Sequence, residues 1–394
     1  MSRAVVGMNV TFTTDPNIAS AINQLFKVYT TAGFKCFLVG GAVRDIMCNQ
    51  TPKDFDFATN APFDFTKSAF EKTIDTGIDH GTITVMVNDN AFEVTRFRTD
   101  MNHNGRHCDV KFAATIEEDL SRRDFTFNAM AMDANGSLID PFNGADDLKD
   151  GIVKFVGSAD QRIREDYLRI LRWFRFMARF GDLSKVDAYT FHCIRQNADG
   201  LRRISRERVW SEISRIVAHE NGPELMTVLF EMGIAQHIDM HPFRDPGAIQ
   251  CLRDAQQVTN APELLLAAWL GWSVPNVSNI ARNWKWSGAE AAHAVWMANN
   301  FGQSKDLRRL IAIENTNRDW VVELAALEQR DGWEQNALAF WEFAPFPVNG
   351  NDLIEAGIKP GLAMGVMLRE LKEAWFRSDY SATKEELMAE LSKV

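Results

Sequence analysis

The sequence has few cysteines, no long apolar run and no surplus of positive charge. Its five cysteines are scattered, odd in number and never spaced as C-x-x-C, which argues against a disulfide framework and a structural zinc site. No apolar run approaches the roughly 20 residues that span a bilayer, and the N-terminal stretch lacks the apolar core of a signal peptide. We therefore expect a cytoplasmic protein with reduced thiols and no membrane partner.

Internal repeats and low-complexity segments are also absent, which excludes solenoid and low-complexity classes. The 394 residues are 46% hydrophobic and 24% charged. This is an ordinary globular composition, long enough for two to four packed units. Composition alone leaves the oligomeric state open.

The net charge of −10 argues against nucleic acid in general, because phosphates need local positive charge. The charge is uneven, however. The stretch 161–217 carries 13 Arg and Lys against seven Asp and Glu, a local charge of +6 in an otherwise acidic chain. Such a segment indicates a confined site for a polyanion, although a solvated charged helix face explains it equally well.

Secondary-structure signals change along the chain at about residue 145. Beyond it, strand patterns nearly vanish, and Leu, Ala, Trp, Arg and Glu recur at helical spacing. The pattern predicts an α+β protein, in which a small mixed sheet with helices precedes an all-helical part. Before residue 145, strands are predicted at 35–39, 53–59 and 128–133, and a hairpin at 82–87 and 91–98.

Asp54 and Asp56 stand two residues apart in an alternating stretch, so their carboxylates share one face of the predicted strand. Phe55 and Phe57 share the other face. Paired carboxylates repel unless a cation lies between them, and hard oxygen ligands suit Mg²⁺. Glu93 on the hairpin could add a third carboxylate, and such a set can hold two ions ~4 Å apart for in-line phosphoryl transfer. A D-x-D pair alone is common on solvent-facing strands, and Glu93 could equally be a surface glutamate.

Gly40 and Gly41 follow the first predicted strand directly and open a predicted helix. Glycines let backbone N–H groups approach a phosphate closely, and a helix N-terminus favours anions. Arg44 can add a forked donor. A double glycine is usually only a turn, but the D-x-D pair thirteen residues later favours a triphosphate site.

The segment Arg122-Arg123-Asp124 allows two interpretations. It could be an ordinary ion-paired strand edge. Because it leads into the apolar N-A-M-A-M stretch, it could also place a buried or cleft-lining arginine, which needs an anion.

The motifs L-V-G-G-A-V-R-D and D-F-D-F-A-T resemble the head signature of the tRNA nucleotidyltransferase (CCA-adding enzyme) and bacterial poly(A) polymerase family, class II type. The likeness runs in order over about 180 residues and resurfaces near the end, whereas 225–345 matches weakly. The further motifs are E-E-D-L-S-R-R-D-F-T-F-N-A-M-A-M-D (117–133), D-P-F-N-G-A-D-D-L-K-D-G-I-V-K-F-V-G (140–157), R-E-D-Y-L-R-I-L-R-W-F-R-F (164–176), R-I-S-R-E-R-V-W-S-E-I (203–213) and N-G-N-D-L-I-E-A-G-I-K-P-G (349–361).

The resemblance implies a polymerase-β-like nucleotidyltransferase head over 1–145. A helical neck with a base-reading helix would follow over 146–225, then a body over 226–345 and a tRNA-binding tail over 346–394. It implies an enzyme that adds C and A from CTP and ATP to the 3′ end of tRNA with Mg²⁺, and releases pyrophosphate. A poly(A) polymerase, a partial CC- or A-adding enzyme and an inactive RNA-binding homologue remain alternatives.

The residues implied to act on the nucleotide are mostly charged. Asp54 and Asp56 would hold the catalytic Mg²⁺, with Glu93 as the further candidate. Asp166 and Arg169 would read the base. The residues implied to contact the nucleotide from other sides are Gly41, Arg44, Arg123, Arg172 and Arg175.

Base choice then has a simple chemical logic. Cytosine and adenine each present an exocyclic amino donor beside a ring acceptor, so one Asp–Arg pair can satisfy both, whereas uracil and guanine present the opposite polarity. If 165–177 forms one helix, Asp166 and Arg169 are neighbours on its charged side. In that case Glu165 and Arg169 could also be a simple ion pair on a solvated face.

The tail carries cations that could contact the acceptor and T-arm half of tRNA. They could equally be solvated surface residues. These cations are Lys359, Arg369, Lys372 and Arg377.

Overall fold

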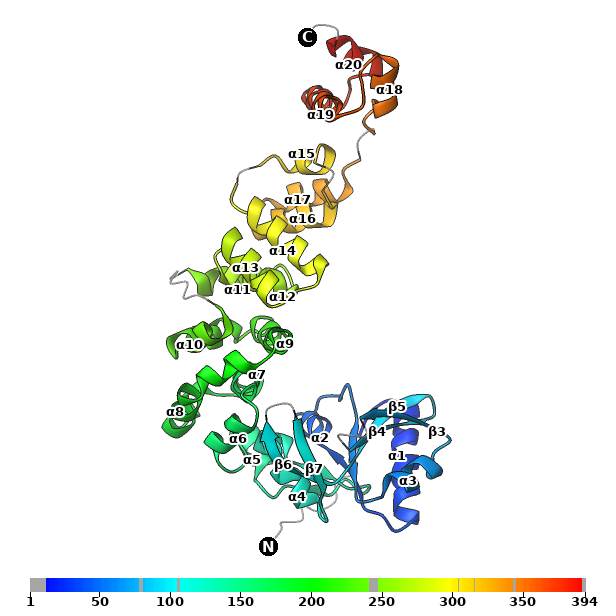
Figure 1. The fold of residues 1–394 in the computed structure, drawn as a ribbon, viewed down its shortest axis with the longest axis vertical. Coiled ribbons are helices and arrows are strands. Elements are labelled where there is room, and N and C mark those ends of the chain that lie inside the picture. Colours follow the sequence, from blue (N-terminus) through cyan, green and yellow to red (C-terminus); the bar gives the residue numbers. More distant parts are fainter. Residues whose placement is uncertain are drawn as a thin grey trace. The chain divides into compact units, whose positions relative to one another are not determined.

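The computed structural model describes residues 12–77, 81–104, 107–240, 247–303, 305–314, 316–342 and 345–391. The chain divides into two compact units, Met1–Pro242 and Phe243–Val394 (Figure 1). In the described residues the last strand ends at Ile139, and all later elements are helical, which confirms the predicted α+β class. The fourfold division stays a prediction, and its first boundary falls inside helix α5 (Gly144–Lys149).

The sheet carries the D-x-D pair near its middle. Its strand order is β3-β4-β5-β2-β1-β8-β9, and β6 pairs separately with β7. Strand β2 runs parallel to β5, and the other neighbours in the large sheet are antiparallel. The described strands are β1 (Cys36–Val39), β2 (Asp56–Thr59), β3 (Lys72–Gly77), β4 (Thr82–Val87), β5 (Asn90–Arg96), β6 (Arg98–Asn104), β7 (His107–Phe112), β8 (Ala131–Met132) and β9 (Leu138–Ile139).

Most predicted strands are confirmed, and their patterns show why. The β4–β5 hairpin turns at Asn88 and Asp89, whose φ angles of 49° and 61° suit a tight two-residue hairpin turn. The strand predicted at 128–133 shrinks to β8, because a short 3₁₀ turn occupies Thr126–Asn128. The sequence signals missed β3, β6, β7 and β9.

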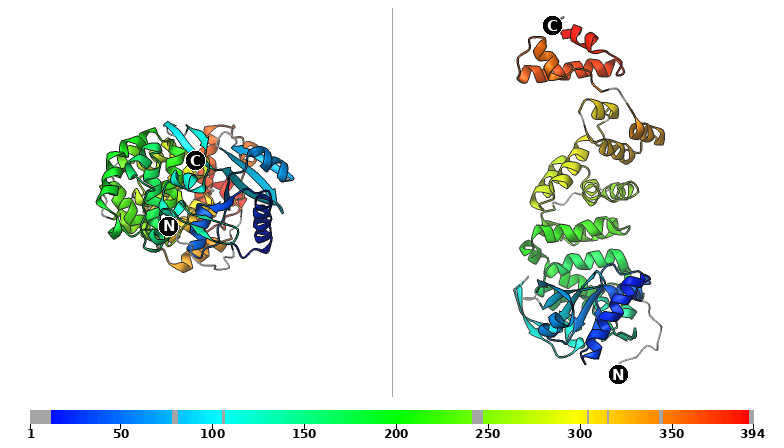
Figure 2. Two further views of the ribbon diagram at one scale, coloured as in Figure 1. Left: turned by 90° about the horizontal axis from the view of Figure 1, so that it is seen from below. Right: turned by 90° about the vertical axis from the view of Figure 1, so that its right-hand side faces the viewer.

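Helices cover the sheet of the first unit. Helix α1 (Pro16–Thr31) starts at Asp15, whose side chain accepts two backbone N–H groups, and packs against β1 and β4 (Figure 2). Phe26 of α1 meets the ring of Phe57 edge-on at 5.3 Å. This contact keeps Phe57 of β2 buried, so the neighbouring Asp56 side chain faces solvent. The other helices of this region are α2 (Gly41–Met47), α3 (Phe63–Ala69) and α4 (Ile116–Ser121).

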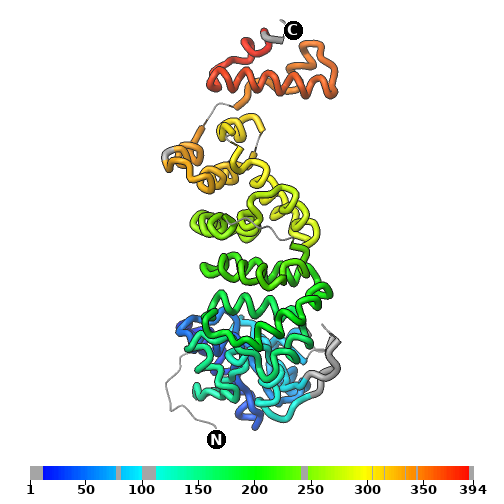
Figure 3. The backbone as a smooth tube through the Cα atoms, turned by 90° about the vertical axis from the view of Figure 1, so that its left-hand side faces the viewer, coloured from blue at the N-terminus to red at the C-terminus, as the bar shows by residue number. Residues whose placement is uncertain are grey.

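A second group of helices, later in the chain, packs mainly against one another within the same unit. Trp173 is fully buried and donates its indole N–H to the Val153 carbonyl at 3.1 Å. Phe176 packs edge-on against Phe125 and Phe127 at 5.3 and 5.2 Å. These contacts hold helix α7 against the segments that carry Phe125, Phe127 and Val153, so the charged side chains of α7 keep a defined position. The helices are α6 (Ala159–Glu165), α7 (Arg169–Phe180), α8 (Ala188–Gln196), α9 (Arg206–Val217) and α10 (Gly222–Glu231), traced in Figure 3.

The described part of the second unit is helical throughout. Within it, His293 lies between Glu263 and Glu323, at 3.1 and 2.9 Å from its two ring nitrogens. No described helix is long and apolar enough to cross a bilayer. The helices are α11 (Ala248–Gln256), α12 (Pro262–Trp269), α13 (Val274–Asn283), α14 (Gly288–Asn300), α15 (Leu307–Ala312), α16 (Arg318–Leu327), α17 (Gly332–Phe340), α18 (Gly350–Glu355), α19 (Leu362–Arg377) and α20 (Lys384–Leu391).

Candidate active site

The two D-x-D carboxylates lie on one side of the chain, as predicted. Asp54 and Asp56 are exposed, and Phe55 and Phe57 are buried. Strand β2 begins only at Asp56, so Asp54 belongs to the approach to the strand. The alternation of exposed and buried side chains therefore begins before the first hydrogen-bonded residue of strand β2.

Glu93 lies beside this pair. Strands β2 and β5 are parallel neighbours, and their register pairs Asp56 with Glu93. Glu93 is exposed, as predicted from its buried neighbours in sequence. Although the Asp56 side chain reaches solvent, the protein packed around its carboxyl group and then the Glu93 charge raise the pKa of Asp56 to about 6. Arg123 opposes this rise and Asp54 adds to it. Crowded negative charge of this kind favours a bound cation.

A divalent cation fits the chemistry of these carboxylates. The described residues contain no ready-made set of three or more His, Cys, Asp or Glu side chains around a metal position. Asp54 and Asp56 would therefore supply two ligands, and substrate phosphates and water the rest, which is the usual arrangement for Mg²⁺.

The glycine turn is shaped by Arg123. Gly40 has a φ of 67°, and a Cβ built on it would lie 2.5 Å from the Arg123 Nη1. Only glycine allows the guanidinium to come this close. Helix α2 begins at Gly41, so the start of the helix faces the same space.

Arg44 and Arg123 both line that space. Arg44 is buried, donates to the Asn128 Oδ1 at 2.7 Å and pairs with Asp45 at 2.8 Å. Arg123 pairs with the fully buried Asp119 at 3.3 Å, yet its Nε is buried without a hydrogen-bond partner among the described residues. Arg123 lies just after helix α4, not on a strand edge, and it lines the cavity, as the cleft interpretation predicted.

The helical backbone is interrupted at Asp166, between α6 and α7. This residue is extended, with φ −151° and ψ 105°, and its Oδ1 accepts the Leu168 N–H at 3.1 Å. The prediction of one helix over 165–177 is wrong, because an Asp side chain that bonds its own backbone two residues on favours a turn. Asp166 and Arg169 still both line the cavity, one before α7 and the other at its first residue.

Arg169 is held mainly by protein groups. Its Nη1 donates to the Glu165 carboxylate at 2.6 Å and to the Arg162 carbonyl at 2.8 Å, and its Nη2 donates to the Arg122 carbonyl at 3.3 Å. The Glu165–Arg169 pair is buried, with side chains 9% and 13% exposed, so it is not on a solvated face. These bonds use three of the five guanidinium N–H groups, and the other two have no hydrogen-bond partner in the described part of the chain.

The next two arginines of α7 are also paired. The Arg172 Nε donates to Asp124 at 2.7 Å, and the Arg175 Nε donates to Glu212 at 2.5 Å. Burial alone would raise the pKa of Asp124, but Arg172 and the hydrogen bond from Asn128 outweigh burial and lower it to about 2. Asp124 therefore remains ionised and holds Arg172 at the cavity.

These side chains enclose one cavity of about 620 Å³. Every predicted site residue lines it except Asp54 and Glu93, which lie beside Asp56. Sequence reasoning missed the contribution of helix α9, although Arg208 and Arg215 stand at helical spacing within the basic segment. The lining residues are Gly40, Gly41, Arg44, Asp56, Arg122, Arg123, Asp124, Asn128, Asp166, Arg169, Arg172, Arg175, Phe176, Arg208 and Arg215.

Comparison with known proteins agrees with this geometry. Residues 36–154 match the family described as poly A polymerase head domain, and residues 185–242 match the probable RNA and SrmB-binding site of polymerase A. The chain is 32% identical over 386 residues to the mitochondrial CCA tRNA nucleotidyltransferase 1 of Danio rerio, covering 94% of this chain and 90% of that protein. It is 31% identical to the CCA-adding enzyme of Ligilactobacillus salivarius, covering 87% and 88%.

The chain belongs to the CCA-adding tRNA nucleotidyltransferase family. The Bacillus stearothermophilus CCA-adding enzyme, solved in complex with CTP, has the same fold, with a TM-score of 0.80, 28% identity, and coverage of 96% of this chain and 98% of that one. The Thermotoga maritima CCA-adding enzyme, solved with tRNA, shares the fold at a TM-score of 0.68 and 19% identity, with coverage of 99% of both chains. The chain is thus a nucleotidyltransferase, and its family depends on a divalent metal.

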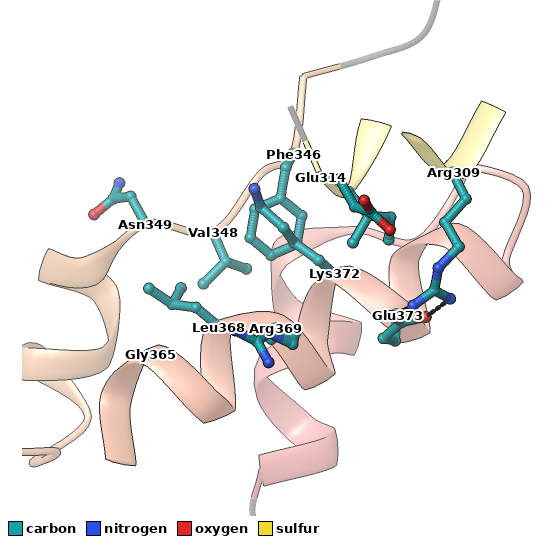
Figure 4. A pocket seen from close by; sticks show the side chains of 11 residues that line it. Arg309, Glu314, Phe346, Val348, Asn349, Gly365, Leu368, Arg369, Lys372 and Glu373 are labelled. Atoms are coloured by element: carbon teal, nitrogen blue, oxygen red, sulfur yellow. Dashed lines mark hydrogen bonds and ion pairs between the residues drawn. The ribbon is translucent and has the colours of Figure 1, made fainter. Parts of the chain in front are cut away.

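This tRNA nucleotidyltransferase has a larger cavity, of about 800 Å³, within the second unit (Figure 4). Arg309 and Glu373 form a doubly hydrogen-bonded ion pair at one side. Arg369 and Lys372 of α19 also line it, and Lys372 lies 5.6 Å from the ring centre of Phe346. Two carboxylates line it as well, Glu314 and Glu373.

Proposed function

We propose that this enzyme adds C and A residues from CTP and ATP to the 3′ end of tRNA, with Mg²⁺ held by Asp54 and Asp56. One observation carries the proposal: a single cavity joins Asp56, at the carboxylate pair, to Asp166 and Arg169, which suit a base. A nucleoside triphosphate has the same three parts, namely phosphates for the metal end, a sugar, and a base for the other end.

The phosphate end of the cavity is built for negative charge. Arg44 and Arg123 would neutralise the triphosphate, and the Gly40–Gly41 turn would let backbone N–H groups approach it. When bound, the metal makes the RNA 3′-hydroxyl a better nucleophile and stabilises charge on the phosphates. Asp54 and Asp56 would hold this metal. The 3′-oxygen would bond to the α-phosphorus as the bond from that phosphorus to the pyrophosphate breaks, and the hydroxyl proton would pass to solvent. Glu93 adds negative charge beside them.

The base end of the cavity would select a nucleotide by the hydrogen-bond donors and acceptors on its base. Asp166 can accept the exocyclic amine of cytosine or adenine, while a free N–H of Arg169 donates to the ring acceptor. Uracil and guanine would place an acceptor against the Asp166 carboxylate. Selection would then need no nucleic-acid template, because protein side chains present the pattern.

Arg172 and Arg175 would support the nucleotide from the wall of α7. Both guanidinium groups are fixed by buried carboxylates, Asp124 and Glu212. Fixed donors need little reorganisation when a charged ligand arrives, which makes their interaction with it stronger.

The RNA would be held through its backbone by cations of the second unit. Arg369 and Lys372 line the cavity of Figure 4, and Lys359 and Arg377 are exposed nearby in sequence. We propose that they contact the acceptor and T-arm half of tRNA.

Radiolabelled CTP and ATP, offered with tRNA that lacks its terminal nucleotides, test the function directly. Addition of two C residues and one A supports it. A long run of A without any C would show a poly(A) polymerase, addition of only C or only A a partial enzyme, and no incorporation an inactive RNA-binding homologue.

We place the enzyme in the cytoplasm, on the composition of its sequence. Some relatives are named as mitochondrial, such as the Danio rerio protein. Microscopy of a C-terminal fluorescent fusion in the source cells tests the compartment, and organelle-restricted signal would reject the proposal.

A further inference from the structure

Asp166 is held from two directions. Its Oδ1 accepts the Leu168 N–H at 3.1 Å, and its Oδ2 accepts from the Arg208 Nη2 at 2.7 Å. The first bond is local to the turn before α7. The second comes from α9, 42 residues further along the chain.

Helix α9 presents a charged face to the nucleotide cavity. Arg208, Glu212 and Arg215 stand at helical spacing, and both arginines line the cavity. Glu212 is buried and bound to Arg175 of α7, so α9 is tied to α7 at the middle of this face. Arg208 therefore approaches Asp166 from a fixed helix.

The orientation of the Asp166 carboxylate depends on its hydrogen bond with Arg208. An extended residue between two helices has no neighbouring helical turn to restrict its side chain. The Leu168 bond fixes one oxygen but leaves the plane of the carboxylate free to rotate about it. A carboxylate offers about four lone-pair positions, so two bonds fix its plane and still leave acceptor sites for a ligand.

We propose that Arg208 is a specificity-determining residue, which positions the Asp166 carboxylate so that its free lone pairs meet the amino group of cytosine or adenine. The inference rests on the proposed function and deepens it, since neither the sequence motifs nor the resemblance assigned Arg208 a role. Without Arg208, the carboxylate could turn away, and uracil or guanine would be rejected less strictly.

A purely stabilising role fits the geometry less well. The side chains of Arg208 and Asp166 are 32% and 24% exposed. Ion pairs with this much solvent access contribute little to folding stability. The contact should therefore matter to what the cavity selects more than to whether the protein folds.

The experiment uses the full chain and three variants. Arg208→Ala removes the contact, and Arg208→Lys keeps the charge but replaces the forked donor by a single ammonium. Arg206→Ala is the matched control, because Arg206 lies on the same helix, pairs with Asp239 at 2.7 Å and does not line the cavity. Single-turnover incorporation of each nucleoside triphosphate is measured on tRNA lacking its terminal nucleotides, with the thermal unfolding midpoint for each variant.

We expect Arg208→Ala to lower the CTP:UTP and ATP:GTP ratios of kcat/KM by about tenfold, with an unfolding midpoint close to wild type. Arg208→Lys should restore part of the ratio, and Arg206→Ala should leave it unchanged. Unchanged ratios in a folded Arg208→Ala protein would overturn the proposal, and so would an equal loss in Arg206→Ala. A raised KM for tRNA at unchanged ratios would also overturn it, since Arg208 would then serve the RNA backbone. If the wild type itself adds neither C nor A, the proposed function fails instead.

Discussion

Gly40→Ala tests how closely the glycine turn and Arg123 depend on each other. Gly40 has a φ of 67° and a ψ of −126°, a conformation that costs an L residue about 1–3 kcal/mol. The new Cβ would also lie 2.5 Å from the Arg123 Nη1, so the guanidinium must move. Both effects follow from one methyl group.

The two effects are separable by measurement. The backbone strain should lower the free energy of unfolding by about 1–3 kcal/mol, seen in urea denaturation. Displacement of Arg123 should remove the charge-assisted hydrogen bond that we propose it donates to the phosphates. Such a bond is worth about 1.5–3 kcal/mol, which is about ten- to hundredfold in kcat/KM for CTP and ATP.

Gly41→Ala is the stability control, because its Cβ would meet the Arg44 Nη2 at an ordinary 3.6 Å. Its unfolding free energy should stay close to wild type. A double-mutant cycle with Arg123→Ala isolates the second effect: in that background, Gly40→Ala should change activity little. The reasoning is refuted if the activity loss from Gly40→Ala is the same with and without Arg123, or if the variant unfolds like wild type.

Four further predictions concern other parts of the enzyme. Asp54→Ala or Asp56→Ala should abolish incorporation of both CTP and ATP while leaving tRNA binding in a filter assay nearly intact; activity within tenfold of wild type would remove that residue from the metal site. Asp166→Ala should relax rejection of UTP and GTP by about one to two decades, since a good base-edge contact is worth about 1–3 kcal/mol; an equal loss toward all four nucleotides would indicate a structural role. A minihelix of the acceptor and T arms should be a substrate, with affinity that falls steeply with salt, and a requirement for the anticodon arm would contradict the proposed tail contacts. The pKa of His293 is raised to about 9 because Glu263 and Glu323 outweigh its burial. The contribution of protonated His293 to the free energy of unfolding should be full below about pH 6.5 and disappear as the pH rises through 9. The thermal unfolding midpoint should therefore fall over this range in the wild type and much less in His293→Gln.

The sequence predicted the parts of the site that follow from local periodicity. Asp54 and Asp56 share a side because Phe55 and Phe57 are buried, and alternation alone indicates this. Glu93 could be assigned to a face in the same way. Its register with Asp56 could not be predicted, because strand pairing is a property of the whole sheet.

The sequence could not predict contacts between distant elements. The break at Asp166 depends on a side-chain bond to Leu168, which helical spacing does not reveal. The pairing of Arg172 with Asp124 spans 48 residues, and that of Arg208 with Asp166 spans 42. The charged residues were visible in the motifs, but their partners depend on how α7 and α9 pack.

All fifteen residues that line the nucleotide cavity lie before residue 243, within the first compact unit. No described residue of the second unit lines this cavity, so substitutions among them leave its lining side chains unchanged. Most of the stretch that matches the family motifs weakly, 243–345, belongs to this second unit. We therefore expect a change in the length or charge of the second unit to alter RNA binding through the proposed tail contacts and to leave the choice of nucleotide unchanged.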